Sequence, residues 1–348
     1  MKPSSLSASR ARQILVRARQ KQILVVGDAM LDHFVQGSVG RISPEAPVPV
    51  LDFESESFMP GGAANVARNL TALQVRTELI GAVGRDAAGA QLKHLLGEHR
   101  IGCRGLIADA TRTTSVKTRV VAHKQQVVRI DRESHAELKP ALSSRLLRTL
   151  ETMIPRSAAV IVGDYGKGVV TQPLLDELKQ ICRAHGVWLS MDPKPVHRLD
   201  LSGLSLITPN RKEAFEMAGL ADETRQSRPL KDPSLLRVAD YLLRTLRPAV
   251  LLITLGELGM LLCQHGKKPF HIPTVARDVF DVSGAGDTVI ATFTLAIAAG
   301  ASPVEAAIIS NHAAGIVVGK TGTATTAPAE LLASFPRLPG KARPASFG

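Results

Sequence analysis

The segment from Asp281 to Asp287 reads DVSGAGD and runs directly into an apolar, helix-forming stretch, TVIATFTLAIAAG. Gly284 and Gly286 allow a tight turn with unobstructed N–H groups, and the N-terminus of the following helix adds partial positive charge. Such a turn binds phosphates. A carboxylate at Asp287 would repel a phosphate there unless it accepts the proton of the attacking hydroxyl. The segment therefore predicts a phosphoryl-transfer site, although a helix cap explains Asp287 taken alone.

Polar residues also follow or close several predicted strands. They are Asp32, Asp164, Asp192, Asn210 and Thr254. Each of them alone is explained as a cap or a turn former. Because ligands of an open α/β sheet bind at the carboxyl ends of its strands, we expect the five side chains to converge on one site.

The elements that must position these residues alternate along the chain. Continuous apolar runs, such as 22–31 and 158–165, predict buried strands, and amphipathic stretches between them predict helices. This pattern is typical of a mainly parallel sheet covered on both faces. Two segments, 48–58 and 114–133, alternate polar and apolar residues instead, which predicts exposed antiparallel strands in a small separate sheet, a lid over the site.

The composition favours a cytoplasmic enzyme. The chain has 348 residues, of which 45% are apolar, so it can bury a substantial core. Its three cysteines, Cys103, Cys182 and Cys263, are an odd and widely spaced set that predicts neither a disulfide framework nor a zinc site. No run approaches the roughly 18 apolar residues of a membrane span, so we expect no membrane partner.

The formal charge of +12 could indicate a nucleic-acid partner, but the basic residues are dispersed and aromatic residues make up only 3%. Anionic small-molecule substrates explain the same charge. Residues 1–22 are basic and predict a short surface helix with Ile14, Leu15 and Ala18 facing inward, and the Pro-rich residues 331–348 predict a frayed tail.

Three ordered motifs, PGGAANVARNL, TPNRKE and GAGDT, resemble those of the ribokinase-like, PfkB-type carbohydrate kinases over residues 23–330. The resemblance implies a three-layer α/β/α fold with a mainly parallel central sheet, a small β-sheet lid with strands near 33–58 and 103–133, and the use of Mg-ATP. The stretches RISPEAPVPV, DYGKG and MDPKP are most similar to the branch that phosphorylates D-glycero-β-D-manno-heptose 7-phosphate at O1 for the synthesis of ADP-heptose and lipopolysaccharide core. Because the chain ends about 20 residues after the last kinase motif, it resembles the stand-alone form of that kinase.

The resemblance also implies residue roles. Asp287 matches the catalytic base, and the amides of Gly284, Ala285 and Gly286 match the anion hole. Glu213 matches a residue that holds Mg²⁺ through water. The positions that match the nucleotide site are Asn210, Arg211, Lys212, Glu213, Thr254, Gly256, Gly259 and Asn311.

The positions expected to contact the sugar are Asp28, Asp32, Gly61, Gly62, Asn65 and Asp192. Candidates for binding the phosphate of the sugar are Lys117, Arg119, Arg129 and Lys194, with Arg41 and Lys167 beside them. Lys117 and Arg119 are two residues apart on a predicted strand and so share a face. Asp281 and Ser283 match a monovalent-cation site, which implies K⁺.

Alternatives stay open within and beyond this family. Another phosphosugar kinase, for example for fructose 6-phosphate, or a nucleoside kinase would share most of these motifs. A non-catalytic sugar sensor should have lost Asp287 or the glycines of the anion hole, and the chain keeps both. The resemblance further implies a homodimer formed through the lid strands.

Overall fold

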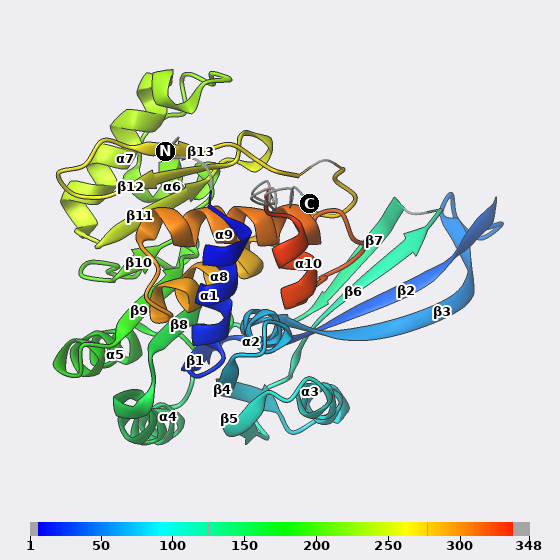
Figure 1. The fold of residues 1–348 in the computed structure, drawn as a ribbon. Coiled ribbons are helices and arrows are strands. Elements are labelled where there is room, and N and C mark those ends of the chain that lie inside the picture. The colour runs from blue at the N-terminus through cyan, green and yellow to red at the C-terminus, as the bar shows by residue number, and fades with distance from the viewer. Residues whose placement is uncertain (1–5, 124, 277, 337–348) are drawn as a thin grey trace, which may run out of the picture.

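The computed structural model describes residues 6–123, 125–276 and 278–336. Its centre is a nine-stranded sheet in the order β13-β12-β11-β10-β9-β8-β1-β4-β5 (Figure 1). The strands from β11 to β5 run parallel, and β12 and β13 continue the sheet as an antiparallel hairpin. The strands are β1 (Gln22–Gly27), β4 (Arg76–Gly84), β5 (Gly102–Asp109), β8 (Ala159–Gly163), β9 (Trp188–Asp192), β10 (Leu206–Ile207), β11 (Val250–Thr254), β12 (Met260–Cys263) and β13 (Phe270–Ile272).

Successive residues of the central strands supply two separate cores, because side chains alternate between the faces of a strand. In β1, Ile23 and Val25 belong to one core, and Leu24 and Val26 to the other. The first core is closed by α1 (Ala8–Ala18), α2 (Ala63–Ala72), α3 (Ala87–Glu98), α8 (Ala285–Ala298), α9 (Pro303–Val317) and α10 (Pro328–Ala333). The second is closed by α4 (Pro140–Met153), α5 (Gln172–Ala184), α6 (Arg211–Ala218) and α7 (Pro233–Leu246). The predicted three-layer architecture is confirmed.

Four long strands form a second sheet that projects from one side of the body (Figure 1). Their order is β3 (Pro49–Gly62), β2 (Ala29–Ile42), β6 (Ser115–Ala122) and β7 (Gln125–Arg132). We call this sheet the lid. The two outer pairs are antiparallel, as predicted, but the central pair, β2 and β6, is parallel.

The predicted second lid segment, 103–133, begins too early. Residues 102–109 form β5, which pairs in parallel with β4 at the edge of the main sheet. Leu106 and Ile107 are buried in the two opposite cores, so this strand is covered on both faces and cannot belong to a sheet with an exposed face.

The single strand predicted for residues 22–31 is in fact two strands in different sheets. The chain leaves the main sheet after Gly27 and enters the lid at Ala29, so Asp28 alone spans the crossing. Gly27 has a φ of +149°, and a Cβ atom on it would lie 2.0 Å from the carbonyl oxygen of Gly163, so only glycine fits. Asp32 consequently lies inside a lid strand rather than at the end of a main-sheet strand.

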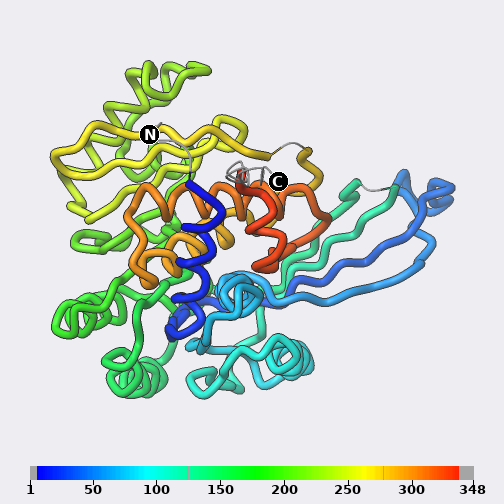
Figure 2. Tube along the Cα trace, viewed as in Figure 1, coloured from blue at the N-terminus to red at the C-terminus, as the bar shows by residue number. Residues whose placement is uncertain are grey.

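Both ends of the described chain pack on the body (Figure 2). Ile14, Leu15 and Ala18 of α1 are buried, which confirms the predicted inner face. The frayed tail predicted from residue 331 is wrong at its start, because Leu331 and Phe335 are buried in the first core. Residues 337–348 and 1–5 lie outside the described residues. Within the described ranges, no helix has the length and apolar content needed to cross a bilayer.

Candidate active site

Asp287 lies in the first turn of α8, and 9% of it is exposed. Its Oδ2 accepts a hydrogen bond from Nδ2 of Asn65 at 2.7 Å, and its Oδ1 accepts one from the hydroxyl of Tyr165. Burial raises the pKa of Asp287 to about 6, although the two hydrogen bonds pull it down. The carboxylate is therefore fixed in orientation and is basic enough to take a proton near neutral pH.

The turn that precedes Asp287 packs closely against Asn65. Gly284 caps α8 with a φ of +77°, and a Cβ atom there would lie 2.6 Å from Nδ2 of Asn65. A side chain would thus disturb the bond between Asn65 and Asp287. The predicted role of the Ala285 amide differs in the structure, since this N–H donates to the carbonyl oxygen of Val282 at 3.2 Å. The amides of Gly284 and Gly286 are the remaining members of the predicted hole.

Tyr165 was not among the predicted site residues, although it directly follows the strand-end residue Asp164 in the DYGKG stretch. Its loop is held by Asp28, whose buried carboxylate accepts the backbone N–H groups of Tyr165, Lys167 and Val169 at 2.9–3.0 Å. The predicted sugar contact of Asp28 is therefore replaced by a positioning role. Burial, followed by the charge of Asp287, raises the pKa of Tyr165 well above its usual value, so its hydroxyl stays a donor.

The other strand-end residues divide between the site and its supports. Asp164 accepts the N–H of Gly166 at 3.0 Å and contacts Nδ1 of His197 at 3.0 Å, so it supports the Tyr165 loop. Asn210 bridges to Thr254 on the neighbouring strand, which brings these two together as expected.

Asp192 and Glu213 place two carboxyl groups near the glycine turn. Oδ2 of Asp192 lies 3.9 Å from an ideal Cβ on Gly286, and Oδ1 accepts the hydroxyl of Thr208 at 3.0 Å. Burial, then the charges of Glu213 and Asp287, raise the pKa of Asp192 to about 8. A divalent cation would relieve this repulsion, and oxygen ligands are those that Mg²⁺ prefers. Among the described residues, no three His, Cys, Asp or Glu side chains are arranged to hold a metal, so the donors fit an ion bound mainly through water and phosphate oxygens.

The segment Asn210–Glu213 begins α6 with a reciprocal capping box. Oδ1 of Asn210 accepts the N–H of Glu213 at 3.0 Å, and the Glu213 carboxylate accepts the N–H of Asn210 at 2.9 Å. The prediction that Arg211 binds nucleotide is wrong for this structure, because its guanidinium is buried in ion pairs with Asp222 and Asp232. Lys212 points outward, with 84% of its side chain exposed.

The predicted turn beside the nucleotide is the β11–β12 connection. Gly256 and Gly259 both have positive φ, and a Cβ on Gly259 would lie 2.0 Å from the carbonyl oxygen of Ile272. Asn311, on α9, donates through Nδ2 to the carbonyl oxygen of Pro273 at 2.7 Å. This bond ties the helix to the segment that follows β13, so Asn311 has a structural partner at the position expected to lie near the base.

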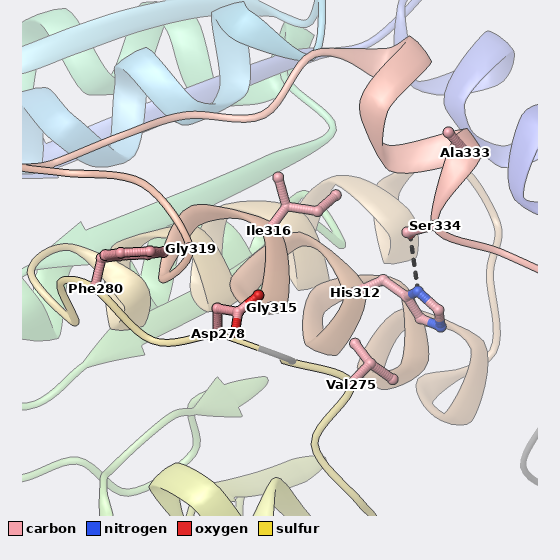
Figure 3. Close-up of a pocket in the computed structure, with 9 residues that line it drawn as sticks. All are labelled: Val275, Asp278, Phe280, His312, Gly315, Ile316, Gly319, Ala333 and Ser334. Atoms are coloured by element: carbon pink, nitrogen blue, oxygen red, sulfur yellow. Dashed lines mark hydrogen bonds between the residues drawn. The ribbon is translucent and has the colours of Figure 1, made fainter.

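A hollow of about 540 Å³ lies between α9 and the side chains of Val275, Asp278 and Phe280, which precede the glycine turn (Figure 3). Gly315 of α9 and Gly319, which follows the helix, line the hollow together with Val275 and Phe280. Val275 packs on Gly315, with its Cγ2 3.0 Å from an ideal Cβ on that glycine. Phe280 is 75% exposed. The hollow therefore offers an exposed apolar wall next to a site for phosphate.

The sugar-side glycines are required by close packing around Asp32. A Cβ on Gly61 would lie 2.7 Å from Oδ2 of Asp32, and one on Gly62 would lie 2.4 Å from Cε of Met30. Asp32 is 4% exposed, and its Oδ1 pairs with Nη1 of Arg119 at 2.6 Å. These predicted sugar contacts are thus brought together at the root of the lid.

The basic lid residues form ion pairs on the same face as Asp32. In the register of the sheet, Lys117 lies directly between Asp32 and Asp131. Its Nζ contacts Glu133 at 2.5 Å and Asp131 at 3.3 Å. Arg129 also pairs with Asp131, at 2.9 Å, with half of its side chain exposed.

Three further predicted residues lie in different places. Lys167 contacts Glu133 beside Lys117. Lys194 is exposed after β9, close enough to Asp192 for its charge to lower the pKa of that carboxyl. Arg41 is not in a loop but in β2, nine residues beyond Asp32, about 30 Å along the strand, so it does not join the site of its own chain.

The predicted cation site is partly assembled. The Asp281 carboxylate accepts the N–H of Ser283 at 2.9 Å and the N–H of Gly322 at 3.0 Å. Asp281 therefore joins the segment that contains Ser283 to the segment that contains Gly322. Binding of K⁺ there stays a prediction.

Comparison with known proteins agrees with this geometry. The family model for pfkB family carbohydrate kinases matches residues 20–330. A curated protein named Bifunctional protein HldE, from Paramagnetospirillum magneticum, is 42% identical over 321 residues, which are 92% of this chain and 64% of that protein. A protein of the same name from Desulfatibacillum aliphaticivorans is 44% identical over 319 residues, with 91% and 64% covered. The chain spans about 64% of the length of these relatives.

Solved structures share the fold. An Arabidopsis thaliana ribokinase complexed with ribose and ATP has a TM-score of 0.69 at 18% identity, covering 90% of this chain and 98% of that one. Phosphofructokinase-2 from Escherichia coli, in complex with substrates and products, has a TM-score of 0.72 at 20% identity, covering 89% and 96%. With its family match across nearly the whole described chain, the protein belongs to the pfkB family of carbohydrate kinases.

Proposed function

We propose that the protein transfers the γ-phosphoryl group of ATP to O1 of D-glycero-β-D-manno-heptose 7-phosphate, which gives heptose 1,7-bisphosphate for the synthesis of ADP-heptose and lipopolysaccharide core. The observation that carries this substrate is the group of ammonium and guanidinium side chains around Asp32, namely Lys117, Lys167 and Arg119. Such a group suits a sugar that already carries a phosphate. The heptose-branch motifs and the relatives named HldE support the same choice.

The transfer needs little covalent chemistry from the protein. Asp287 accepts the proton of the anomeric hydroxyl as that oxygen attacks the γ-phosphorus, and the bond to the leaving β-phosphate oxygen breaks. Tyr165 and Asn65 hold the carboxylate in place. The amides of Gly284 and Gly286 and the N-terminus of α8 stabilise negative charge on the moving group. Glu213 and Asp192 would hold Mg²⁺ through water, and the ion would supply neutralisation of the charge on the phosphates.

The donor nucleotide extends from the anion-binding turn along the hollow beside α9. Its base lies in this hollow, against the apolar side chains of Val275 and Phe280. The exposure of those two apolar residues supports this, since a bound base would cover them.

The face of the lid opposite to Asp32 supports a homodimer. Phe58, His33 and Ile130 share this face in the register of the sheet, and the rings of His33 and Phe58 stack at 4.3 Å. Ile130 is 58% exposed, which a second copy of the chain would reduce. Sedimentation of the wild type and of Ile130→Lys tests this. A monomer for both proteins would overturn the dimer without affecting the assignment of the reaction.

The function is tested by measuring ADP release with Mg-ATP and a panel of acceptors: heptose 7-phosphate, fructose 6-phosphate, ribose and adenosine. We expect kcat/KM for heptose 7-phosphate to exceed that for every other acceptor by at least about tenfold. Preference for another sugar would overturn the substrate and keep the kinase chemistry. No release with any of them would favour a sugar sensor.

A further inference from the structure

Glu133 lies at the centre of a compact ion-pair cluster at the root of the lid. One carboxylate oxygen contacts Nζ of Lys117 at 2.5 Å, and the other contacts Nζ of Lys167. The three side chains come from separate elements, since Lys117 is in β6, Lys167 follows β8 and Glu133 follows β7. Their side chains are between 10% and 19% exposed. The cluster is therefore largely removed from water.

This cluster adjoins the sugar pocket. Lys117 is the register neighbour of Asp32, and the next residue on the same face, Arg119, binds Asp32 directly. The backbone of Lys167 is fixed by Asp28 in the loop that carries Tyr165. Both ammonium groups thus lie on elements that also carry or support the acceptor and base residues.

The charges of the cluster match those of a phosphate better than those of one carboxylate. Two partly buried ammonium groups need compensating negative charge, because leaving them unpaired is costly. Glu133 supplies one charge, and Asp131 contributes at 3.3 Å to Lys117 only. A phosphate monoester carries nearly two charges at neutral pH and three acceptor oxygens, so it satisfies both lysines more completely.

We propose that Glu133 is a displaceable counter-ion that occupies the phosphate subsite of the acceptor. This inference rests on the proposed function and deepens it by assigning the subsite to Lys117 and Lys167. Glu133 neutralises the two lysines until the phosphate of the sugar replaces it. His135, whose Nε2 is already 3.4 Å from the carboxylate and whose side chain is 67% exposed, offers the released carboxylate a partner nearer to solvent.

Selectivity for phosphorylated sugars follows from this exchange. A neutral sugar offers nothing to replace Glu133, so the carboxylate stays between the lysines. A phosphorylated sugar exchanges a carboxylate for a stronger anion. Glu133 is thus a specificity-determining residue, and removing its charge should improve the binding of any small phosphate.

The test compares the wild type with Glu133→Gln by calorimetric titration of inorganic phosphate and by steady-state kinetics. We expect Glu133→Gln to bind phosphate about tenfold more tightly, because the substitution removes the carboxylate that competes with phosphate for the two lysines. A tenfold change in affinity corresponds to about 1.4 kcal/mol of binding free energy. KM for heptose 7-phosphate should fall by a similar factor, with kcat and KM for ATP changed less than about twofold. Glu151→Gln, on the exposed surface of α4, makes the same charge change and should alter neither the affinity for phosphate nor KM for heptose 7-phosphate.

Lys117→Met provides the converse variant and should weaken phosphate binding by at least about tenfold. The proposal is wrong if Glu133→Gln binds phosphate no more tightly than the wild type, or if Lys117→Met binds it equally well. These titrations do not need turnover. Tighter binding in a protein that phosphorylates no sugar would therefore reject the proposed function and keep the subsite, whereas heptose kinase activity without tighter binding would reject only the subsite.

Discussion

Asn65 donates a hydrogen bond from Nδ2 to Oδ2 of Asp287 at 2.7 Å, across 222 residues of sequence. The bond joins the first turn of α2 to the first turn of α8, so two helix N-termini meet at one carboxylate. Tyr165 approaches the other carboxylate oxygen from the loop after β8. The base is therefore held by three elements from distant parts of the chain.

Asp287→Asn should lower kcat by about 10²- to 10⁴-fold, because the amide cannot accept the proton of the attacking hydroxyl. Binding of ATP and of the sugar should change less than about threefold, since the substitution keeps the size of the side chain. Rapid-quench turnover and equilibrium titration of ATP measure the two effects. A kcat close to that of the wild type would reject Asp287 as the base.

The pH profile should report the state of Asp287. Only the ionised carboxylate accepts a proton, and its pKa is about 6, so kcat/KM should fall as the pH drops through 6. Tyr165→Phe removes a hydrogen bond that lowers this pKa. The acid limb should therefore move to higher pH, by about one unit.

Tyr241→Phe is the matched control, since Tyr241 is the other tyrosine of the chain and is 45% exposed on α7. The acid limb of the kcat/KM profile of Tyr241→Phe should coincide with that of the wild type. If Tyr165→Phe lowers kcat but leaves the acid limb of kcat/KM at the same pH, the tyrosine shapes the pocket without changing the pKa of Asp287.

Arg211→Ala should destabilise the fold by about 3 kcal/mol, because it leaves the fully buried Asp232 without its cation. Lys212→Ala, at an exposed position, should change the free energy of unfolding by less than about 0.5 kcal/mol. Urea titrations measure both. KM for ATP should stay within about twofold for Arg211→Ala below its unfolding transition, and a large rise in KM with unchanged stability would restore the nucleotide role.

Gly259→Ala should destabilise the protein by about 2–4 kcal/mol, because a Cβ at this positive φ would overlap the carbonyl oxygen of Ile272. Gly266→Ala has a similar φ but open space around it, so only the conformational cost of about 1 kcal/mol applies. Thermal unfolding of the two variants separates overlap from backbone strain. Equal losses would mean that the hairpin shifts to accept the methyl group.

The layered fold could be predicted because its signals are local. Apolar strands such as the one at 158–165 and helix starts such as Ser302 and Pro303 are visible in short windows. The crossing at Asp28 could not be predicted, because Ala29 to Leu31 continue the apolar run of β1 and their burial depends on distant partners. The parallel pairing of β2 with β6 is a choice between separated segments and leaves no local trace.

Among the site residues, Asp287 and its glycine turn could be predicted because turn, helix start and carboxylate are adjacent in the chain. The roles of Arg211 and Asp28 could not. An arginine beside a phosphate-binding motif and one buried against Asp232 look identical in sequence, and only the folded position decides between them. The role of Glu133 could not be predicted for the same reason, because its partners Lys117 and Lys167 are 16 and 34 residues away in the sequence.

The crossing at Asp28 makes this residue a mechanical pivot. Its backbone connects the body to the lid, and its carboxylate clamps the loop that presents Tyr165 to Asp287. Three hydrogen bonds of 2.9–3.0 Å tie the loop to this residue, with no intervening linker between the loop and the start of the lid. The lid connection and the placement of the Tyr165 loop therefore depend on the same residue, so a substitution of Asp28 should disturb the proposed sugar site and the proposed base together.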